Sequence, residues 1–147
     1  MMQIDDEVSG VSRLFLDTSP VIYFVERNPQ FVGVVDPIFE RLEAEITAVV
    51  SPVTIAECLV GALRLNLAAL QQAYLEILDS ENVVFVESSR MIAREAARIR
   101  FEYNFQLPDA LQIATAIAAN CDAFLTNDIQ LKRVTELRVL VVGEMEA

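Results

Sequence analysis

The sequence has 147 residues, of which 54% are apolar, and its 22 acidic and 11 basic residues give a formal net charge of −11. This length and apolar content are typical of a chain that buries a hydrophobic core. The absence of histidine excludes Ser–His and Cys–His nucleophilic catalysis. Four scattered glycines and one lysine, Lys132, argue against a phosphate-binding loop or a Schiff base.

The chain shows no targeting or redox signal. Its apolar runs, such as residues 83–86, are far too short to span a bilayer, and the first residues are acidic rather than a basic export signal. We therefore expect a cytoplasmic protein without a membrane contact. Cys58 and Cys121 have neither CxxC spacing nor a histidine partner, which predicts reduced, buried thiols.

The predicted elements begin after a polar segment. Residues 1–12 are acidic and without periodicity, so we expect a flexible N-terminal extension, followed by one domain over residues 13–147. Short apolar runs then predict strands at residues 13–16, 46–50, 83–86, 123–125 and 139–141.

Longer amphipathic stretches lie between these runs. A helix is expected to open near Thr18, and apolar stripes predict helices over residues 67–78, with Asn66 as its cap, and 92–103. Residues 108–119 are apolar nearly all round, which predicts a buried helix. The alternation of short strands and helices favours an α/β fold, a three-layer α/β/α sandwich with a central parallel sheet.

Four acidic residues are placed where such a sheet gathers ligands. Asp17, Glu57 and Asp128 each follow a predicted strand, and Asp109 opens the apolar helix. Because ligands bind beyond the carboxyl ends of parallel strands, we expect these side chains to converge. Clustered carboxylates repel one another unless they hold a hard cation, which predicts a Mg²⁺ or Mn²⁺ site.

Each acid also has a structural interpretation. Asp17 and Asp128 are good helix N-caps, Thr54 and Glu57 have capping-box spacing, and Asp109 lies in a first helical turn, where the helix dipole favours an acid. Taken singly, these interpretations compete on about equal terms with a functional one. Convergence of the four acids at one edge is the argument for function.

Two details favour function and one opposes it. Asp109 opens a helix with little solvated surface, where a lone carboxylate is costly. Gly61, one turn after Glu57, is unfavourable in a helix and suggests a close approach there. The net charge of −11 argues against nucleic-acid binding unless divalent ions neutralise part of it.

Four segments of the sequence, in this order and spacing, resemble the PIN-domain nucleases, particularly the VapC-type toxins of prokaryotic toxin–antitoxin pairs. They are LDTS at 16–19, TIAEC at 54–58, LPDALQIATA at 107–116 and FLTND at 124–128. The resemblance runs from about residue 14 to residue 142. It implies a PIN-like fold, an acidic pocket for one or two Mg²⁺ or Mn²⁺ ions, and hydrolysis of RNA phosphodiester bonds.

The resemblance also implies residue roles and partners. By position, the metal-binding catalytic acids are Asp17, Glu57, Asp109 and Asp128, with Ser19 and Thr126 as supporting hydroxyls. It implies a homodimer and a VapB-like antitoxin that inserts a segment into or beside the site.

A stripe of arginines follows the third strand, formed by Arg90, Arg94 and Arg98. These side chains are candidates for contact with RNA phosphates or an acidic antitoxin segment. We favour a solvated helix face paired with Glu87, Glu95 or Glu102.

Two other functions stay open at this point. The acidic surface suggests a PIN-like partner- or RNA-binding module with little or no catalytic turnover. A receiver-like phosphoryl-transfer domain is the third alternative, although Asp5, Asp6 and Lys132 are poorly placed for it.

Overall fold

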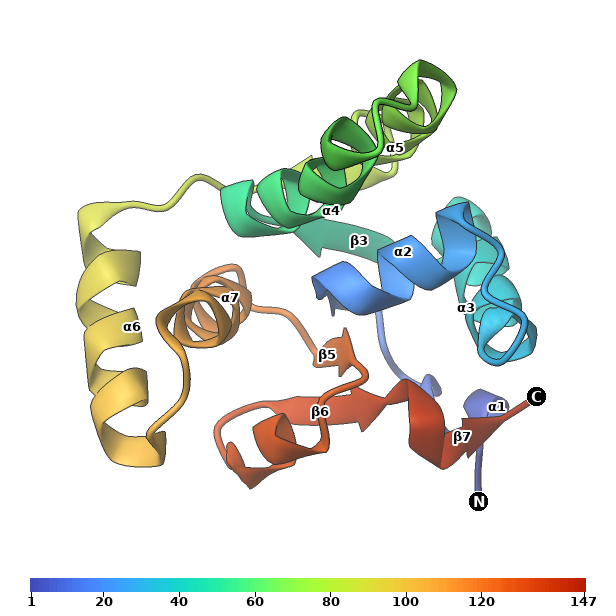
Figure 1. Cartoon of the computed structure of the whole chain (residues 1–147). Helices are drawn as coiled ribbons and strands as arrows, with labels where there is room; N and C mark the ends of the chain where they lie inside the picture. Colours follow the sequence, from blue (N-terminus) through green and yellow to red (C-terminus); the bar gives the residue numbers. More distant parts are fainter.

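The computed structural model describes residues 1–147, and its centre is a five-stranded parallel sheet (Figure 1). The strands, in spatial order, are β4 (Val83–Phe85), β3 (Thr47–Val50), β2 (Arg13–Leu16), β5 (Ala123–Thr126) and β6 (Arg138–Val141). The chain runs outward from β2 to β4, then crosses to β5 on the other side of β2. Open α/β sheets bind ligands in the crevice at the carboxyl ends of the two strands where the order reverses, which in this sheet are β2 and β5.

Helices cover both faces of the sheet. One face carries α2 (Thr18–Val25), α3 (Val32–Ala44), α4 (Pro52–Arg64) and α5 (Ala68–Leu78). The other carries α6 (Arg90–Tyr103), α7 (Leu107–Ala118) and the 3₁₀ helix η1 (Ile129–Arg133). None of these helices combines the length and apolar character needed to cross a bilayer.

Alternation along the strands divides the interior into two cores. In β2, Leu14 and Leu16 pack into the core under α2–α5, whereas Phe15 packs against α6 and α7. Successive strand side chains point to opposite faces, so a strand buried on both sides is apolar throughout. The predicted three-layer α/β/α sandwich is confirmed, and each predicted strand matches an observed one to within one residue at either end.

The start of α4 differs from the expected capping box. Ser51 caps this helix through hydrogen bonds from backbone N–H groups of the first turn, and Pro52 occupies the first helical position. The capping box expected for Thr54 and Glu57 is therefore wrong, because both residues lie inside α4. The expected close approach at Gly61 is also wrong, since nothing lies within 4 Å of where its Cβ would be.

Left-handed residues end several helices. Asn66, expected to cap α5, instead adopts a φ of 55° after α4, and Leu67 takes the N-cap position without a side-chain hydrogen bond. Asn104 and Asn120 adopt φ values of 58° and 56° after α6 and α7. Asparagine tolerates this conformation better than most residues and so terminates a helix cleanly.

Residues 1–12 differ from the flexible extension that we expected. The segment forms β1 (Met2–Gln3) and α1 (Ile4–Glu7), and β1 pairs in parallel with β7 (Met145–Glu146), which follows the 3₁₀ helix η2 (Val142–Glu144). Ile4 and Val8 are each 2% exposed and belong to the core under α2–α5. The acidic residues of α1 pair with basic residues of the main fold, in the pairs Asp5–Arg41 and Glu7–Arg138. Figure 1 shows the two chain ends next to each other.

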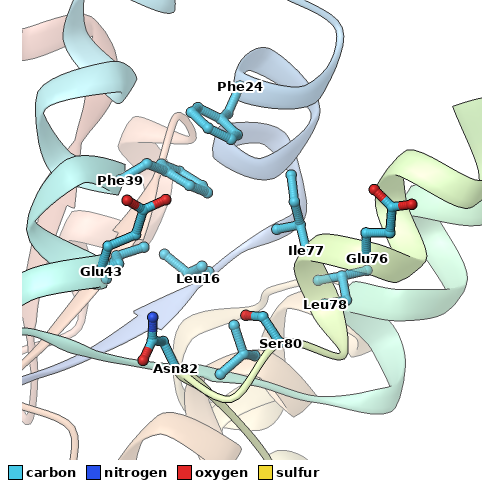
Figure 2. Close-up of a pocket in the computed structure, with 11 residues that line it drawn as sticks. Leu16, Phe24, Phe39, Glu43, Glu76, Ile77, Leu78, Ser80 and Asn82 are labelled. Atoms are coloured by element: carbon cyan, nitrogen blue, oxygen red, sulfur yellow. The ribbon is translucent and has the colours of Figure 1, made fainter.

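A cavity of about 460 Å³ opens between α2, α3 and α5 (Figure 2). Its walls are mostly apolar and include the stacked rings of Phe24 and Phe39, whose centroids lie 4.1 Å apart. Figure 2 shows the carboxylates of Glu43 and Glu76 on opposite sides of this cavity. None of the four predicted site acids lines it, so it is separate from the crevice at β2 and β5.

Candidate functional site

Asp17 lies at the carboxyl end of β2, where the strand order reverses. It follows β2 directly, is 8% exposed, and its backbone N–H donates to the carbonyl of Leu125 at 3.0 Å. Its Oδ1 accepts a hydrogen bond from the N–H of Thr18 at 2.9 Å, so it caps α2, and its Oδ2 accepts one from the Thr126 hydroxyl at 2.8 Å. Burial raises the pKa of Asp17, although hydrogen bonds from Thr126, Thr18 and Gln112 oppose this shift.

Asp109 lies beside Asp17, in the first turn of α7, and is half-buried. Burial, followed by the negative charges of Asp17, Asp128 and Glu57, raises the pKa of Asp109 to about 6. Such charges act on one another only at short range in a protein. The structure therefore brings the four predicted acids into one region.

Glu57 and Asp128 form the exposed side of this region. The Oε1 atom of Glu57 on α4 accepts a hydrogen bond from the Thr18 hydroxyl at 2.7 Å. Asp128 caps η1, its Oδ1 accepting from the N–H of Gln130 at 2.9 Å, and its own N–H donates to Thr126 Oγ1 at 3.1 Å. The capping expected of Asp128 is present, together with its position in the acidic region.

None of the four carboxylates has a basic partner. The structure contains eight ion pairs, all of which involve other acids. Gathered negative charges are unfavourable without a neutralising cation, and a donor set made only of oxygen atoms suits Mg²⁺ or Mn²⁺. The residues thus fit such an ion in chemistry and charge.

The acids are not, however, arranged as a preformed ion site. No group of three or more Asp, Glu or Cys side chains has the geometry to hold a metal ion. Hydrogen bonds to Thr18 and Gln130 hold Glu57 and Asp128 in their present orientations. Both side chains are exposed and rotate at little cost, so ion binding here requires side-chain rearrangement.

A buried hydrogen-bond network behind Asp17 was not predicted. Gln112 donates from Nε2 to Thr54 Oγ1 at 2.8 Å and to Asp17 Oδ1 at 3.5 Å, and its Oε1 accepts from the Ser51 hydroxyl. Thr54 donates in turn to the carbonyl of Leu16 at 3.2 Å. Gln112, Ser51 and Thr54 are at most 1% exposed, and no buried side-chain polar atom lacks a partner. The network ties α4 and α7 to the end of β2 and fixes Asp17.

The remaining predicted residues divide into bonded and free side chains. Thr126 contacts Asp17, whereas the half-buried Ser19 makes no side-chain hydrogen bond, and its supporting role stays a prediction. Arg98 forms ion pairs with Glu95, Glu102 and Glu136. The first two partners agree with the expected solvated helix face, and Glu136 was not predicted. Arg90 and Arg94 are exposed and form no ion pair, with Glu87 or any other acid.

The sequence itself identifies the family. Residues 14–137 match the PIN domain family, and the chain belongs to this family. The family resemblance seen in the four sequence segments is thereby confirmed. No curated protein matches the chain.

Solved structures share the fold. VapBC2 from Rickettsia felis, bound to a promoter DNA fragment, is 22% identical over 88% of this chain and 98% of that chain, with a TM-score of 0.72. A toxin–antitoxin complex from Klebsiella pneumoniae is 23% identical over 89% and 98%, with a TM-score of 0.70. Mycobacterium tuberculosis VapC20, a sarcin–ricin-loop-cleaving toxin, is 13% identical over 76% and 86%, with a TM-score of 0.65.

Proposed function

We propose that this PIN-domain protein is a divalent-metal-dependent endoribonuclease and the toxin of a toxin–antitoxin pair. The observation that carries the proposal is the group of carboxylates without basic partners at the crevice between β2 and β5. Its location matches the general position of ligand sites in open parallel sheets. The toxin role is supported by the fold shared with the Rickettsia and Klebsiella complexes.

The residues that would hold Mg²⁺ or Mn²⁺ are Asp17, Glu57, Asp109 and Asp128. A bound ion supplies Lewis-acid stabilisation of charge on the phosphate and lowers the pKa of a coordinated water. Asp17 is the fixed member of the set, because Thr18 and Thr126 hold both of its carboxylate oxygens. Glu57 and Asp128 are exposed, so theirs are the side chains that would reorient if an ion were bound.

Asp109 makes ion binding dependent on pH. With a pKa of about 6, its carboxyl group carries a proton below that pH and then offers a weaker ligand. We therefore expect the affinity for Mg²⁺ or Mn²⁺ to rise between about pH 5 and pH 7.

Hydrolysis at this site needs no side-chain nucleophile. The chain contains no histidine, and both cysteines are buried. The role left to the acids is to orient the attacking water and the scissile phosphate. RNA as the substrate is supported by VapC20, whose fold this chain shares and which cleaves the sarcin–ricin loop.

The partners belong to the same proposal. Three of the similar structures are toxin–antitoxin complexes, which supports a VapB-like antitoxin as the partner of this chain. We also propose that the protein forms a homodimer. Light scattering of the purified protein would test this. Growth arrest on expression, relieved by coexpression of the antitoxin gene, would test the toxin role directly.

The nuclease is tested with a mixed RNA pool and purified protein, with and without Mg²⁺ or Mn²⁺. The expected result is cleavage that EDTA, Asp17→Asn and Asp109→Asn each abolish. Asp122→Asn, at the opposite end of the sheet, is the matched control and should cleave normally. Cleavage that persists in EDTA or in either site variant contradicts the proposal.

A second candidate is a PIN-like binding module without catalytic turnover. It is favoured by the lack of a preformed ion site among the acids. Titration calorimetry with Mn²⁺ distinguishes the two. Binding that Asp17→Asn and Asp109→Asn remove supports the nuclease, whereas no heat at millimolar Mn²⁺ supports the binding module.

A further inference from the structure

We propose that the outward face of α6 and the start of α7 form a platform for single-stranded RNA, with a nucleobase stacked on Phe101. This inference deepens the proposed ribonuclease function and rests on it, because it assigns residues that lead the substrate to the acidic crevice. The platform residues form no hydrogen bond or ion pair with the four site acids.

Phe101 is the most exposed large hydrophobic residue of the protein, at 89%. It borders an open hollow of about 420 Å³, whose lining residues are Ala97, Arg100, Phe101, Asn104 and Leu107. Leu107 is itself 48% exposed. An aromatic face and an aliphatic side chain flanking a hollow can hold a flat apolar group, and every nucleobase offers such a face.

The same helix face carries unpaired positive charge. Its outward stripe has the spacing i, i+4, i+7 and i+11, formed by Arg90, Arg94, Ala97 and Phe101. The opposite face is buried through Ile92, Ala96 and Ile99. Arg90 and Arg94 therefore project to the same side as Phe101, about 16 and 10 Å from it along the helix axis.

These two arginines are unusual in this protein. Among its 11 basic residues, all but three make a hydrogen bond or an ion pair, and the three are Arg64, Arg90 and Arg94. The acids of α6 do not neutralise them, because Glu95 and Glu102 are bound to Arg98. In a chain of net charge −11, this face offers the phosphate backbone free cationic groups.

The platform is continuous with the acidic crevice. Leu107 lines the hollow and begins α7, and Asp109 follows two residues later in the first turn of the same helix. Figure 1 shows α6 at the outside of its layer, beyond α7. A strand that passes along α6 and stacks on Phe101 thus reaches the N-terminus of α7, where the acids are gathered.

The features favour RNA over an acidic peptide. Free arginines attract either polyanion, but every nucleotide of a single strand carries a base that can stack on the exposed ring, whereas an acidic side chain of a peptide has no such face. Stacking of one base is worth roughly a tenfold gain in affinity or more.

The absence of tryptophan allows a direct test. Phe101→Trp places a single indole on the platform, and Met91→Trp, on the same helix at a residue that is 71% exposed, is the matched control. Each variant is titrated in EDTA with a short single-stranded RNA, with an abasic oligonucleotide of equal length and with polyglutamate. We expect RNA to quench the fluorescence of Phe101→Trp and not that of Met91→Trp, with little effect of the other two polyanions.

Affinity provides the second measurement. Fluorescence anisotropy of labelled RNA in EDTA should show binding weakened about tenfold by Phe101→Ala, restored by Phe101→Tyr, and less dependent on salt in Arg94→Gln. Equal quenching at both tryptophans, quenching by the abasic chain, stronger binding of polyglutamate, or unchanged affinity of Phe101→Ala would each overturn the platform.

These measurements do not require cleavage. RNA quenching without ion-dependent cleavage would retain the platform and reject the nuclease. Ion-dependent cleavage without quenching would retain the nuclease and reject the platform.

Discussion

The two ends of the central sheet treat aspartate in opposite ways. At the amino end, Asp122 precedes β5 and accepts hydrogen bonds from the backbone N–H groups of Ser12 and Arg13, each at 2.8 Å, which lower its pKa. At the carboxyl end, burial and neighbouring negative charge raise the pKa of Asp109 to about 6. The fold therefore stabilises the ionised form of Asp122 and destabilises the ionised form of Asp109.

This difference separates Asp122, whose charge the fold stabilises, from Asp109, whose charge the fold does not offset. Backbone donors satisfy Asp122 without any partner. Asp109 at the carboxyl end receives neither a hydrogen bond nor a cationic partner from the chain, so its ionised form lowers the stability of the metal-free protein. A local loss of stability of this kind is common at functional sites.

Cleavage activity should distinguish the two ends of the sheet most strongly. Loss of a ligand for the proposed ion removes several kcal/mol of transition-state stabilisation, so Asp17→Asn and Asp109→Asn should each lower kcat/KM for RNA by about 1000-fold. Asp122→Asn should stay within a few-fold of the unmodified protein. The measurement is initial-rate cleavage of a fluorogenic RNA in Mn²⁺. A comparable loss of kcat/KM in Asp122→Asn would contradict a special role of the acids at the carboxyl end.

Disruption of the network behind Asp17 should have the next largest effect. Gln112→Leu removes a donor to Asp17 and leaves the buried hydroxyls of Ser51 and Thr54 short of a partner. Loss of a hydrogen bond that orients a metal-binding side chain lowers activity about 10- to 100-fold. Affinity for Mn²⁺ by calorimetry should fall in parallel with kcat/KM. Unchanged ion affinity would show that the network supports folding alone.

At the amino end the expected effect is on stability. Asp122→Ala leaves the N–H groups of Ser12 and Arg13 without their acceptor, which should cost about 1 kcal/mol in chemical denaturation. The lowered pKa of Asp122 means that its contribution is complete above the unfolded-state value and is lost as pH falls through the folded-state value. A variant with normal stability at pH 7 would contradict this.

An effect of similar size and opposite sign is expected at the carboxyl end. Because the folded state raises the pKa of Asp109 from 3.8 to about 6, folding favours its protonated form, and stability should fall as pH rises through this window. Asp109→Asn should flatten that dependence and stabilise the metal-free protein by about 1 kcal/mol at pH 7, after allowance for screening at a half-exposed site. Denaturation in EDTA at pH 5 and pH 7 measures both effects.

The strands and the acids could be predicted because they depend on local pattern. A run such as residues 13–16 is apolar throughout because both sheet faces are covered, and Asp17 follows it directly. The ends of β2 and β5 place Asp17 and Asp128 at one edge, and Glu57 lies on the helix that follows β3 at the same edge. Whether these acids and Asp109 are catalytic stays a prediction.

Other features depend on contacts between distant parts of the chain. Gln112 meets Ser51 across 61 residues, and no local rule pairs them, although a glutamine inside the apolar helix α7 was a signal. The parallel pairing of β1 with β7 joins the two ends of the chain, so residues 1–12 resembled a loose segment when read alone. At α4, Ser51 and Thr54 form the capping box, displaced by three residues from the expected one.

The two cysteines described as buried have a practical consequence. Burial is the main cause that raises the pKa of the Cys58 thiol to about 12 and that of Cys121 to about 11, so neither forms the reactive thiolate near neutral pH. Maleimide dyes or spin labels should therefore attach to a newly introduced surface cysteine and leave the native ones untouched. The unaltered chain is thus a ready background for distance measurements between labelled copies or along a bound strand.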